Sequence, residues 1–122
     1  MNPRQFLLIG GAVLLLVAIL GFVGVIGPTP EKSVFGGNWW FDNGENWAHL
    51  VIGIAGLVAA FALPAKLQKL LVVVLGVIGV LVGLYSLIIS TNFLGSQLQN
   101  PLDTILHLGV GAWALIAARG RS

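Results

Sequence analysis

The segment FLLIGGAVLLLVAILGFVGVI, residues 6–26, decides the fold class because it contains no charged side chain. A helix needs about 20 consecutive apolar residues to cross the hydrocarbon core of a bilayer, and this segment is long enough. It is also longer than the apolar part of a cleaved signal peptide, about 7–15 residues, and no clear cleavage site follows it. We therefore expect a retained membrane helix that Pro28 and Pro30 end, since proline lacks the amide donor that a helix needs.

Three further apolar segments follow, over residues 47–63, 70–89 and 102–118. The first carries only His49 as an ionisable group, the second has none, and the third carries Asp103 and His107. The segment 70–89 is long enough to span a bilayer, and the other two reach that length once their capped starts are included. The sequence therefore predicts an all-α integral membrane protein with one domain, residues 1–122, and four helices at roughly 5–27, 44–63, 67–91 and 101–118.

The composition independently favours the membrane class. Of the 122 residues, 57% are hydrophobic and only 8% are charged, against about 25% charged residues in soluble domains. The net charge of +2 does not indicate nucleic-acid binding, because the basic residues lie at the ends of the apolar segments. The absence of cysteine excludes disulfides, iron–sulfur clusters and thiol nucleophiles.

The basic residues predict the orientation in the membrane. If the four helices are threaded in turn, five basic residues fall on one side and only Lys32 falls on the other. The positive-inside rule then places both termini and the turn PAKLQK (residues 64–69) in the cytoplasm of a bacterial inner membrane. The five basic residues are Arg4, Lys66, Lys69, Arg119 and Arg121.

The two histidines of the chain end two similar octapeptides, DNGENWAH at 42–49 and NPLDTILH at 100–107. Beyond them, HLVIGIAGLVAAF aligns with HLGVGAWALIAAR, which pairs Gly53 with Gly111. We interpret the chain as two helical hairpins, residues 1–64 and 65–122, that repeat one unit. Both hairpins run in the same direction, so a pseudo-twofold axis along the membrane normal would relate them.

Small residues follow each histidine on one helix face, since steps of three and four residues stay on one side of a helix. Such stripes allow close backbone approach in lipid, and we expect the second and fourth helices to pack through them. The third helix carries a similar glycine face. The predicted packing positions are Gly53 and Gly56 on the second helix, Gly111 on the fourth, and Gly76, Gly79 and Gly83 on the third.

The acids have a simple structural interpretation. Asp42 followed by Glu45, and Asn100 followed by Asp103, each match a capping residue with an acid three positions later. The histidines one turn further on are expected to form a polar clasp near the outer face, in which each imidazole donates to a carboxylate or hydroxyl group and ties the second helix to the fourth. Tyr85 is expected at a similar depth. The predicted cluster comprises Glu45, His49, Tyr85, Asp103 and His107.

Three other interpretations of the histidines stay open. His49 and His107 with the two acids could ligate a transition metal, although acid and histidine are four residues apart and the di-iron bundle motif has three. The histidines could be axial ligands of a haem or a chlorophyll-type pigment. They could also mark a proton or ion path. We expect no metal and no cofactor, and the lack of a catalytic triad or phosphate loop argues against an enzyme.

The loop between the first two helices is rich in aromatic residues. Trp39, Trp40 and Trp47 lie within or next to GGNWWFDNG, residues 36–44. Aromatic side chains favour the lipid headgroup layer, so interfacial anchoring is expected. The alternative is a surface that docks a partner protein or lipid.

The stretches GAVLLLVAILGFVG (11–24), ENWAHLVIGIAGLVAAF (45–61) and NPLDTILHLGVGAWAL (100–115) resemble the bacterial membrane proteins of the domain of unknown function, family 4383. The resemblance covers nearly the whole chain and implies four helices, with a histidine-leucine step opening the second helix. The resemblance also implies an acid four residues before a histidine-leucine step at the start of the fourth helix, as at Asp103 and His107. The Trp39–Trp40 loop and Glu45 depart from the family pattern. The family has no assigned activity.

The sequence thus predicts a small membrane protein with a structural or accessory-subunit role, as a homo-oligomer or beside a larger membrane complex. The alternative is a cofactor-binding subunit of an electron-transfer or photosynthetic complex that uses His49 and His107. The expected partners are the lipid bilayer and protein, not nucleic acid.

Overall fold

The structure is a computed structural model, and it describes residues 2–89, 92–93, 96–97 and 102–120. Four helices dominate it: α1 (Pro3–Phe22), α2 (Asn43–Ala62), α3 (Ala65–Ile88) and α4 (Leu102–Ala117). Two 3₁₀ turns, η1 (Pro30–Lys32) and η2 (Gly36–Asn38), lie in the loop between α1 and α2. The strands β1 (Asn92–Phe93) and β2 (Ser96–Gln97) form a short antiparallel pair before α4. The predicted all-helical class with four helices is confirmed.

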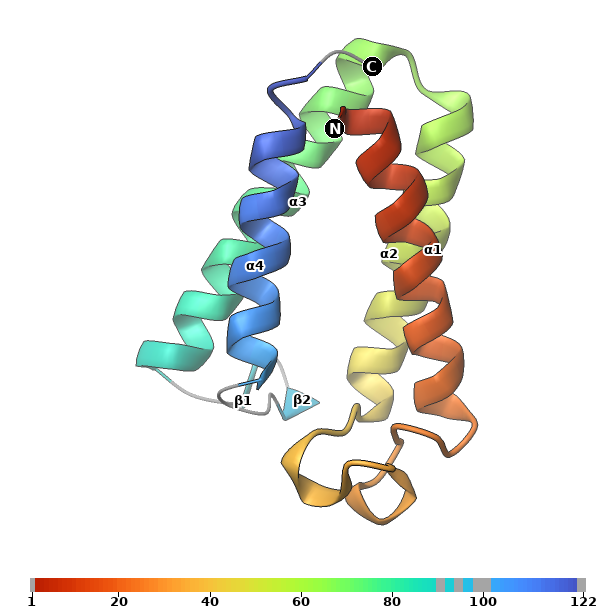
Figure 1. Cartoon of the computed structure of the whole chain (residues 1–122), viewed down its shortest axis with the longest axis vertical. Helices are drawn as coiled ribbons and strands as arrows, with labels where there is room; N and C mark the ends of the chain where they lie inside the picture. The colour runs from red at the N-terminus through yellow and green to blue at the C-terminus, as the bar shows by residue number, and fades with distance from the viewer. Residues whose placement is uncertain (1, 90–91, 94–95, 98–101, 121–122) are drawn as a thin grey trace.

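The helices form two hairpins, α1 with α2 and α3 with α4 (Figure 1). Both chain ends and the α2–α3 turn lie at one end of the bundle, called here the terminal end. The two long connections lie at the other end, called here the loop end. The hairpins meet mainly through α1, which contacts α3 and α4.

The expected end of the first helix was wrong. α1 stops at Phe22, well before Pro28, because Gly24 adopts the left-handed conformation with φ +90°. The Val25 N–H then bonds the Leu20 carbonyl at 3.2 Å, which satisfies a carbonyl that the helix leaves open. Glycine suits this position because it lacks a Cβ. The prolines therefore shape the loop, not the helix end.

At the terminal end, one apolar cluster joins all four helices. Phe6 of α1 meets Trp113 of α4 edge to face, with ring centroids 4.5 Å apart. The α2 carbonyls at this end accept hydrogen bonds from Arg4 and Gln68, which solves the problem of unpaired carbonyls at a helix C-terminus. The buried cluster comprises Phe6, Leu7, Ala59, Ala60, Val72, Ala114, Ala117 and Ala118.

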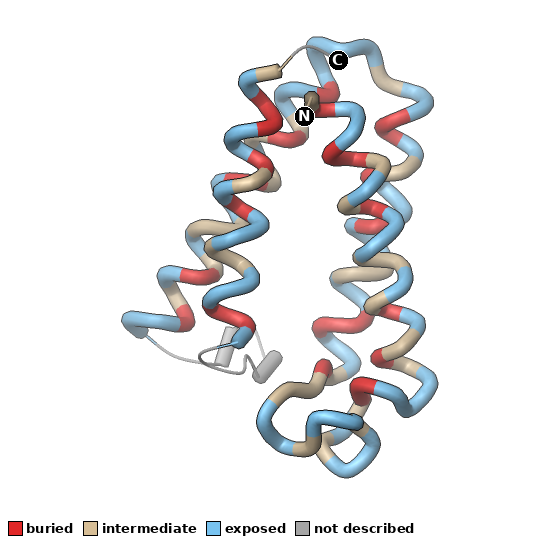
Figure 2. The backbone as a smooth tube through the Cα atoms, viewed as in Figure 1, coloured by how far each residue is buried: buried red, intermediate tan, exposed pale blue. Residues whose placement is uncertain are grey.

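Burial follows a simple rule across the fold. The buried positions are mostly glycine and alanine, whereas most large aliphatic residues are exposed. Figure 2 shows how buried and exposed positions alternate along the helices. On α2 the outward ridge is formed by Val51, Ile54, Val58 and Phe61, at helical spacing. Three helices, α1, α2 and α3, are long and apolar enough to cross a membrane, and α4 is a shorter apolar helix.

Candidate functional site

Buried polar side chains collect at the loop end of the bundle. Glu45 and Asp103 are only 5% and 1% exposed, and Asn46, Ser86 and Thr104 are buried beside them in the same layer of α2, α3 and α4. Burying a polar group is costly unless it is hydrogen-bonded. The contacts of these side chains therefore define the candidate site.

The first turn of α2 forms the predicted capping box. The Asp42 carboxylate accepts from the Glu45 N–H at 2.9 Å, and Glu45 Oε1 accepts from the Asp42 N–H at 3.4 Å. The capping interpretation of Asp42 and Glu45 is confirmed. The matching cap proposed at Asn100 lies outside the described residues.

Asp103 has a contact that sequence analysis missed. The indole N–H of Trp39 donates to Asp103 Oδ1 at 3.0 Å, which ties the α1–α2 loop to the first turn of α4. Trp39 stacks edge to face on Phe41, whose side chain is buried. Trp39 is thus a structural bridge between the hairpins, in addition to any interfacial role.

Glu45 and Asp103 face each other from the two hairpins. The Glu45 side chain lies within hydrogen-bonding reach of the Asp103 side chain and within electrostatic range of Asp42. Glu45 Oε2 is fully buried and has no hydrogen-bond donor. The acids therefore contact each other directly at the loop end.

The histidines are brought together, but they do not form the predicted clasp. His107 Nδ1 donates to the main-chain carbonyl of Asp103 on its own helix at 2.7 Å, since a carbonyl only accepts. His49 lies close enough to His107 for the two rings to interact electrostatically, but its buried Nδ1 has no partner. The Phe41 ring packs edge to face on His49 at 5.4 Å. Carboxyl and indole groups join the hairpins here; the imidazole contacts do not.

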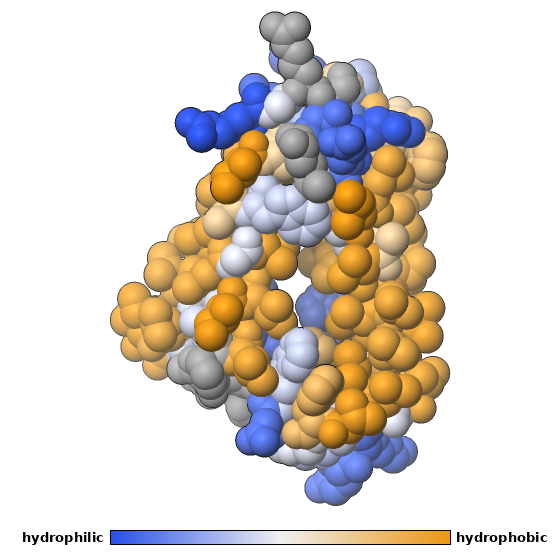
Figure 3. Space-filling view, in the orientation of Figure 1, coloured by the Kyte–Doolittle hydropathy of each residue, from blue (hydrophilic) through white to orange (hydrophobic). Residues whose placement is uncertain are grey.

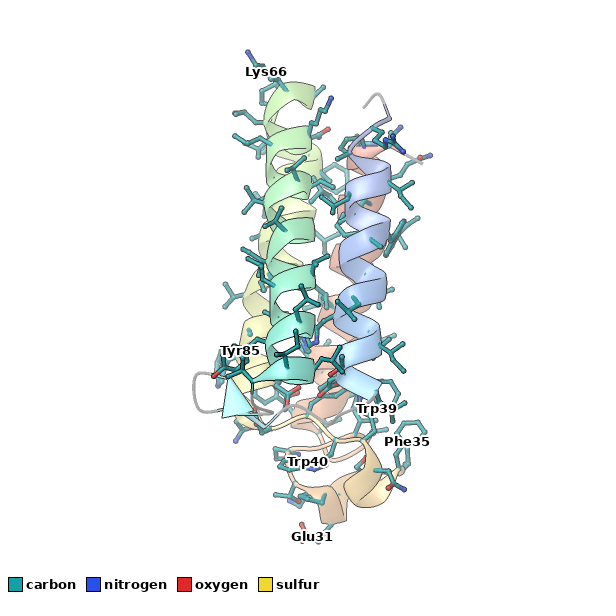
Figure 4. The ribbon with its side chains drawn as sticks, turned by 90° about the vertical axis from the view of Figure 1, so that its left-hand side faces the viewer. Glu31, Phe35, Trp39, Trp40, Lys66 and Tyr85 are labelled. Carbon is teal, nitrogen blue, oxygen red and sulfur yellow. The ribbon has the colours of Figure 1, made fainter. Side chains whose placement is uncertain are left out.

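The α3–α4 hairpin has its own buried polar link. The hydroxyl groups of Ser86 and Thr104 are 2.6 Å apart, and Ser86 also donates to the Gly83 carbonyl at 3.0 Å. Tyr85, on the neighbouring position, is half-buried and lines a shallow apolar groove of about 520 Å³ with residues of α3 (Figure 4). Tyr85 lies on the last turns of α3, near the loop end.

The expected packing of the second helix on the fourth was wrong. α2 and α4 make no extensive contact, and each glycine stripe packs within its own hairpin. A Cβ built on Gly53 would lie 2.9 Å from the Leu15 backbone nitrogen of α1, and Gly56 also faces α1 at Gly11. In the second hairpin, Gly111 faces the α3 backbone. The predicted packing role of the glycines holds, with a different partner helix.

The α3 glycine face also packs as a close-approach surface, against α4. A Cβ added at the first, second or third glycine of this face would lie 2.9 Å from Leu115, 3.2 Å from Gly111 or 2.7 Å from Leu108. The three positions are Gly76, Gly79 and Gly83. Gly53 and Gly111, aligned in the predicted repeat, thus play equivalent parts in their hairpins. The internal repeat itself stays a prediction.

The other two tryptophans differ in exposure. Trp47 is 59% exposed at the start of α2 and packs its edge against Phe22. Trp40 is half-buried in the loop, near Phe35 and Trp39 at the loop end (Figure 4). An exposed Trp47 at the end of an apolar helix fits the predicted interfacial position.

Within the described residues, no group of three or more histidine and acidic side chains is arranged to hold a metal ion. The four-ligand interpretation therefore has no support in this geometry. No protein-family model, curated protein or solved structure matches this sequence. Membership of family 4383 stays a prediction that depends on the motifs quoted above.

The Trp39–Asp103 bond gives a direct test of how the loop end is held. Trp39→Phe keeps the aromatic contacts but removes the indole donor. Hydrogen bonds to charged groups contribute about 1.5–3 kcal/mol, so unfolding in detergent should become easier by about 1–2 kcal/mol. Trp40→Phe, in the same loop, is the control and should change stability less. Equal effects of the two substitutions would contradict the bridging role of Trp39.

Proposed function

We propose that the protein is an integral membrane protein. The observation that carries the proposal is the inverted distribution of side chains, with bulky apolar residues exposed on the outside and small or polar residues inside. A soluble monomer rarely exposes such continuous apolar surface. On the face that Figure 3 shows, apolar residues cover most of the middle of the bundle, and hydrophilic residues gather at both ends.

The proposed topology places the terminal end in the cytoplasm of a bacterial inner membrane. Four basic residues lie on segments at the terminal end: Arg4, Lys66, Lys69 and Arg119. In Figure 4, Lys66 and Glu31 lie at opposite ends of the molecule. Arg121 lies outside the described residues. The positive-inside rule supports this orientation. The loop end, with its acids and tryptophans, would then face the outside.

The proposed role is that of a structural or accessory subunit, as a homo-oligomer or beside a larger membrane complex. Two features support it. At the loop end the Trp39–Asp103 bond connects the two hairpins and the Ser86–Thr104 bond links α3 to α4, while the glycine faces pack the helices within each hairpin. What remains on the outside is apolar side-chain surface that lipid or another membrane protein can cover.

Extraction from native membranes tests both parts of the proposal. We expect the protein to stay in the pellet after an alkaline carbonate wash and to dissolve only with detergent. Native mass spectrometry of the gentle detergent extract should then give multiples of the 12.8 kDa chain or a particle with a second membrane protein. Release by carbonate would refute membrane insertion. A monomer without partners would refute the accessory role alone.

A cofactor-binding subunit is the second candidate, and one observation favours it. His49 and His107 approach each other from the two hairpins, and the bond from His107 Nδ1 to a main-chain carbonyl directs its Nε2 lone pair elsewhere. Histidine ligands of metals and haems commonly use such a second bond. The same native extract should then absorb visible light or carry a stoichiometric metal, and loss of that signal in His107→Leu would locate it. An extract without either signal would exclude this candidate.

A further inference from the structure

The contact between Glu45 and Asp103 raises a chemical problem. Both side chains are almost completely buried, they come from different hairpins, and they lie within hydrogen-bonding reach of each other. Ionised carboxylates only accept hydrogen bonds, so two of them cannot bond to each other. Two like charges in contact also cannot both be ionised at low cost.

Each carboxyl group already has one oxygen bonded to a donor. Glu45 Oε1 accepts from the Asp42 N–H, and Asp103 Oδ1 accepts from the Trp39 indole. The second Glu45 oxygen, Oε2, is buried without a donor. Such an oxygen is too enclosed for water, but a proton fits there without any added volume.

We propose that the Glu45–Asp103 pair is a proton-binding site that closes the loop end of the bundle. One proton resides on one carboxyl group, which donates it to the other across the interface between the hairpins. The bond formed is an O–H···O bond between Glu45 and Asp103, and its release returns the proton to solvent. The inference goes beyond the accessory role and depends only on the two-hairpin architecture.

The loop-end turns of the described helices carry four further ionisable groups. Asp42 and His49 come from α2, His107 from α4, and Tyr85 from the last turns of α3. On the part of α1 that the structure describes, the one charged side chain is Arg4, at the terminal end. No Arg or Lys lies in the loop-end turns of α1, α2, α3 or α4, and Lys32, the one basic residue of the described α1–α2 loop, is exposed. A proton is therefore the cation that suits this buried position.

Loss of the proton would act on the interface where the hairpins are least connected. At the terminal end the apolar cluster holds all four helices together, whereas the two helix pairs lie apart toward the loop end in Figure 1. Figure 3 shows an opening between them near the middle of the molecule, with hydrophilic atoms beside it. Two unprotonated carboxylates would repel each other, and the hairpins should separate at the loop end about the terminal cluster. The site would then make closure sensitive to external pH.

The test measures the distance between the hairpins as a function of pH. The chain has no cysteine, so spin labels can be introduced by Val51→Cys and Ile105→Cys, two exposed positions near the loop end of α2 and α4. Val58→Cys with Ile116→Cys provides a matched pair nearer the terminal end. Pulsed electron resonance in lipid nanodiscs would follow both distances from about pH 5 to about pH 10, a range that spans ordinary and raised carboxyl titration.

We expect the loop-end distance to lengthen by several ångström as pH rises, while the terminal-end distance stays constant. Glu45→Gln should abolish this response, because a neutral amide donates permanently to Asp103. The substitution should keep the helix cap, since α1 of this chain forms its own capping box with Asn2 and Gln5. Glu31→Gln removes an exposed acid and should respond like the wild type.

Asp103→Asn is the second variant, and it should also hold the loop end closed at every pH. A wild-type distance that does not change with pH would overturn the proposal. So would a wild-type response that persists in both Glu45→Gln and Asp103→Asn, because the histidines or Asp42 would then carry it. Neither result bears on membrane insertion, which the carbonate wash tests separately.

Discussion

Val77→Lys is expected to disfavour insertion of α3 into the membrane by about 3 kcal/mol, the cost of a lysine near the centre of a spanning helix. Val77 lies near the middle of α3 and is 45% exposed on the outside of the bundle. The substitution disturbs no buried contact. In a soluble protein, an added charge at an exposed position would change stability by no more than about 0.5 kcal/mol.

A matched substitution on the same helix separates depth from charge. Leu67 is also exposed but lies in the first turn of α3, beside Lys66 and Lys69. A lysine there reaches the aqueous interface, so Leu67→Lys should insert nearly as well as the wild type. Insertion would be measured by glycosylation of tagged α3 hairpins in a translocon assay. Equal insertion of both variants would contradict the placement of Val77 near the bilayer centre.

The helices and their class could be predicted because they depend on local properties of the sequence. Long uncharged apolar runs, caps such as Asp42 with Glu45, and turn prolines act within a few residues. The end of α1 shows the limit of this reasoning. Gly24 ends the helix by a backbone conformation that several glycines of the segment could adopt, and the more conspicuous Pro28 suggested the wrong residue.

The candidate site was predicted only in part, because tertiary contacts decide it. The spacing of Glu45, His49, Asp103 and His107 predicted that these residues lie near one another, and in the structure Glu45 interacts with Asp103 and His49 with His107. The sequence spacing could not show that the small-residue stripes pack within the hairpins, because a glycine face can pack against any neighbouring helix. The signal that could have indicated this packing is the small residues on the first and third helices. Gly11 on α1 lies against α2, and Gly76 on α3 lies against α4.

Trp39, Asn46 and Thr104 were missed for a related reason. Trp39 lies in a cluster of aromatic residues, and nothing local identifies which of them points inward to Asp103. Asn46 is completely buried against Gly21 of α1, and its amide donates to the Phe41 carbonyl at 3.3 Å. A polar residue beside a capping acid looks like part of a solvated first turn. Only the close approach of α1 at Gly21 makes it an interior residue.

Gly111 and Gly109 allow a strict test of the packing on α4, because they lie on the same helix two positions apart. A Cβ added at Gly111 would lie 2.8 Å from the Val80 backbone nitrogen and 2.9 Å from the Gly76 carbonyl oxygen, both in the α3 main chain. Main-chain atoms cannot rotate away, so the helices would have to separate. A Cβ at Gly109 meets nothing within 4 Å.

We expect Gly111→Ala to destabilise the protein by about 2 kcal/mol, within the range of about 1–3 kcal/mol for overpacked interiors. This cost exceeds the helix-propensity gain of about 1 kcal/mol for replacing glycine by alanine. Gly109→Ala should show the propensity gain without the clash and should be neutral or slightly stabilising. Unfolding in mixed detergent micelles would measure both. Because lipid offers α3 and α4 no hydrophobic gain for associating, a destabilised Gly109→Ala or an unaffected Gly111→Ala would refute close glycine packing as the force that holds this hairpin.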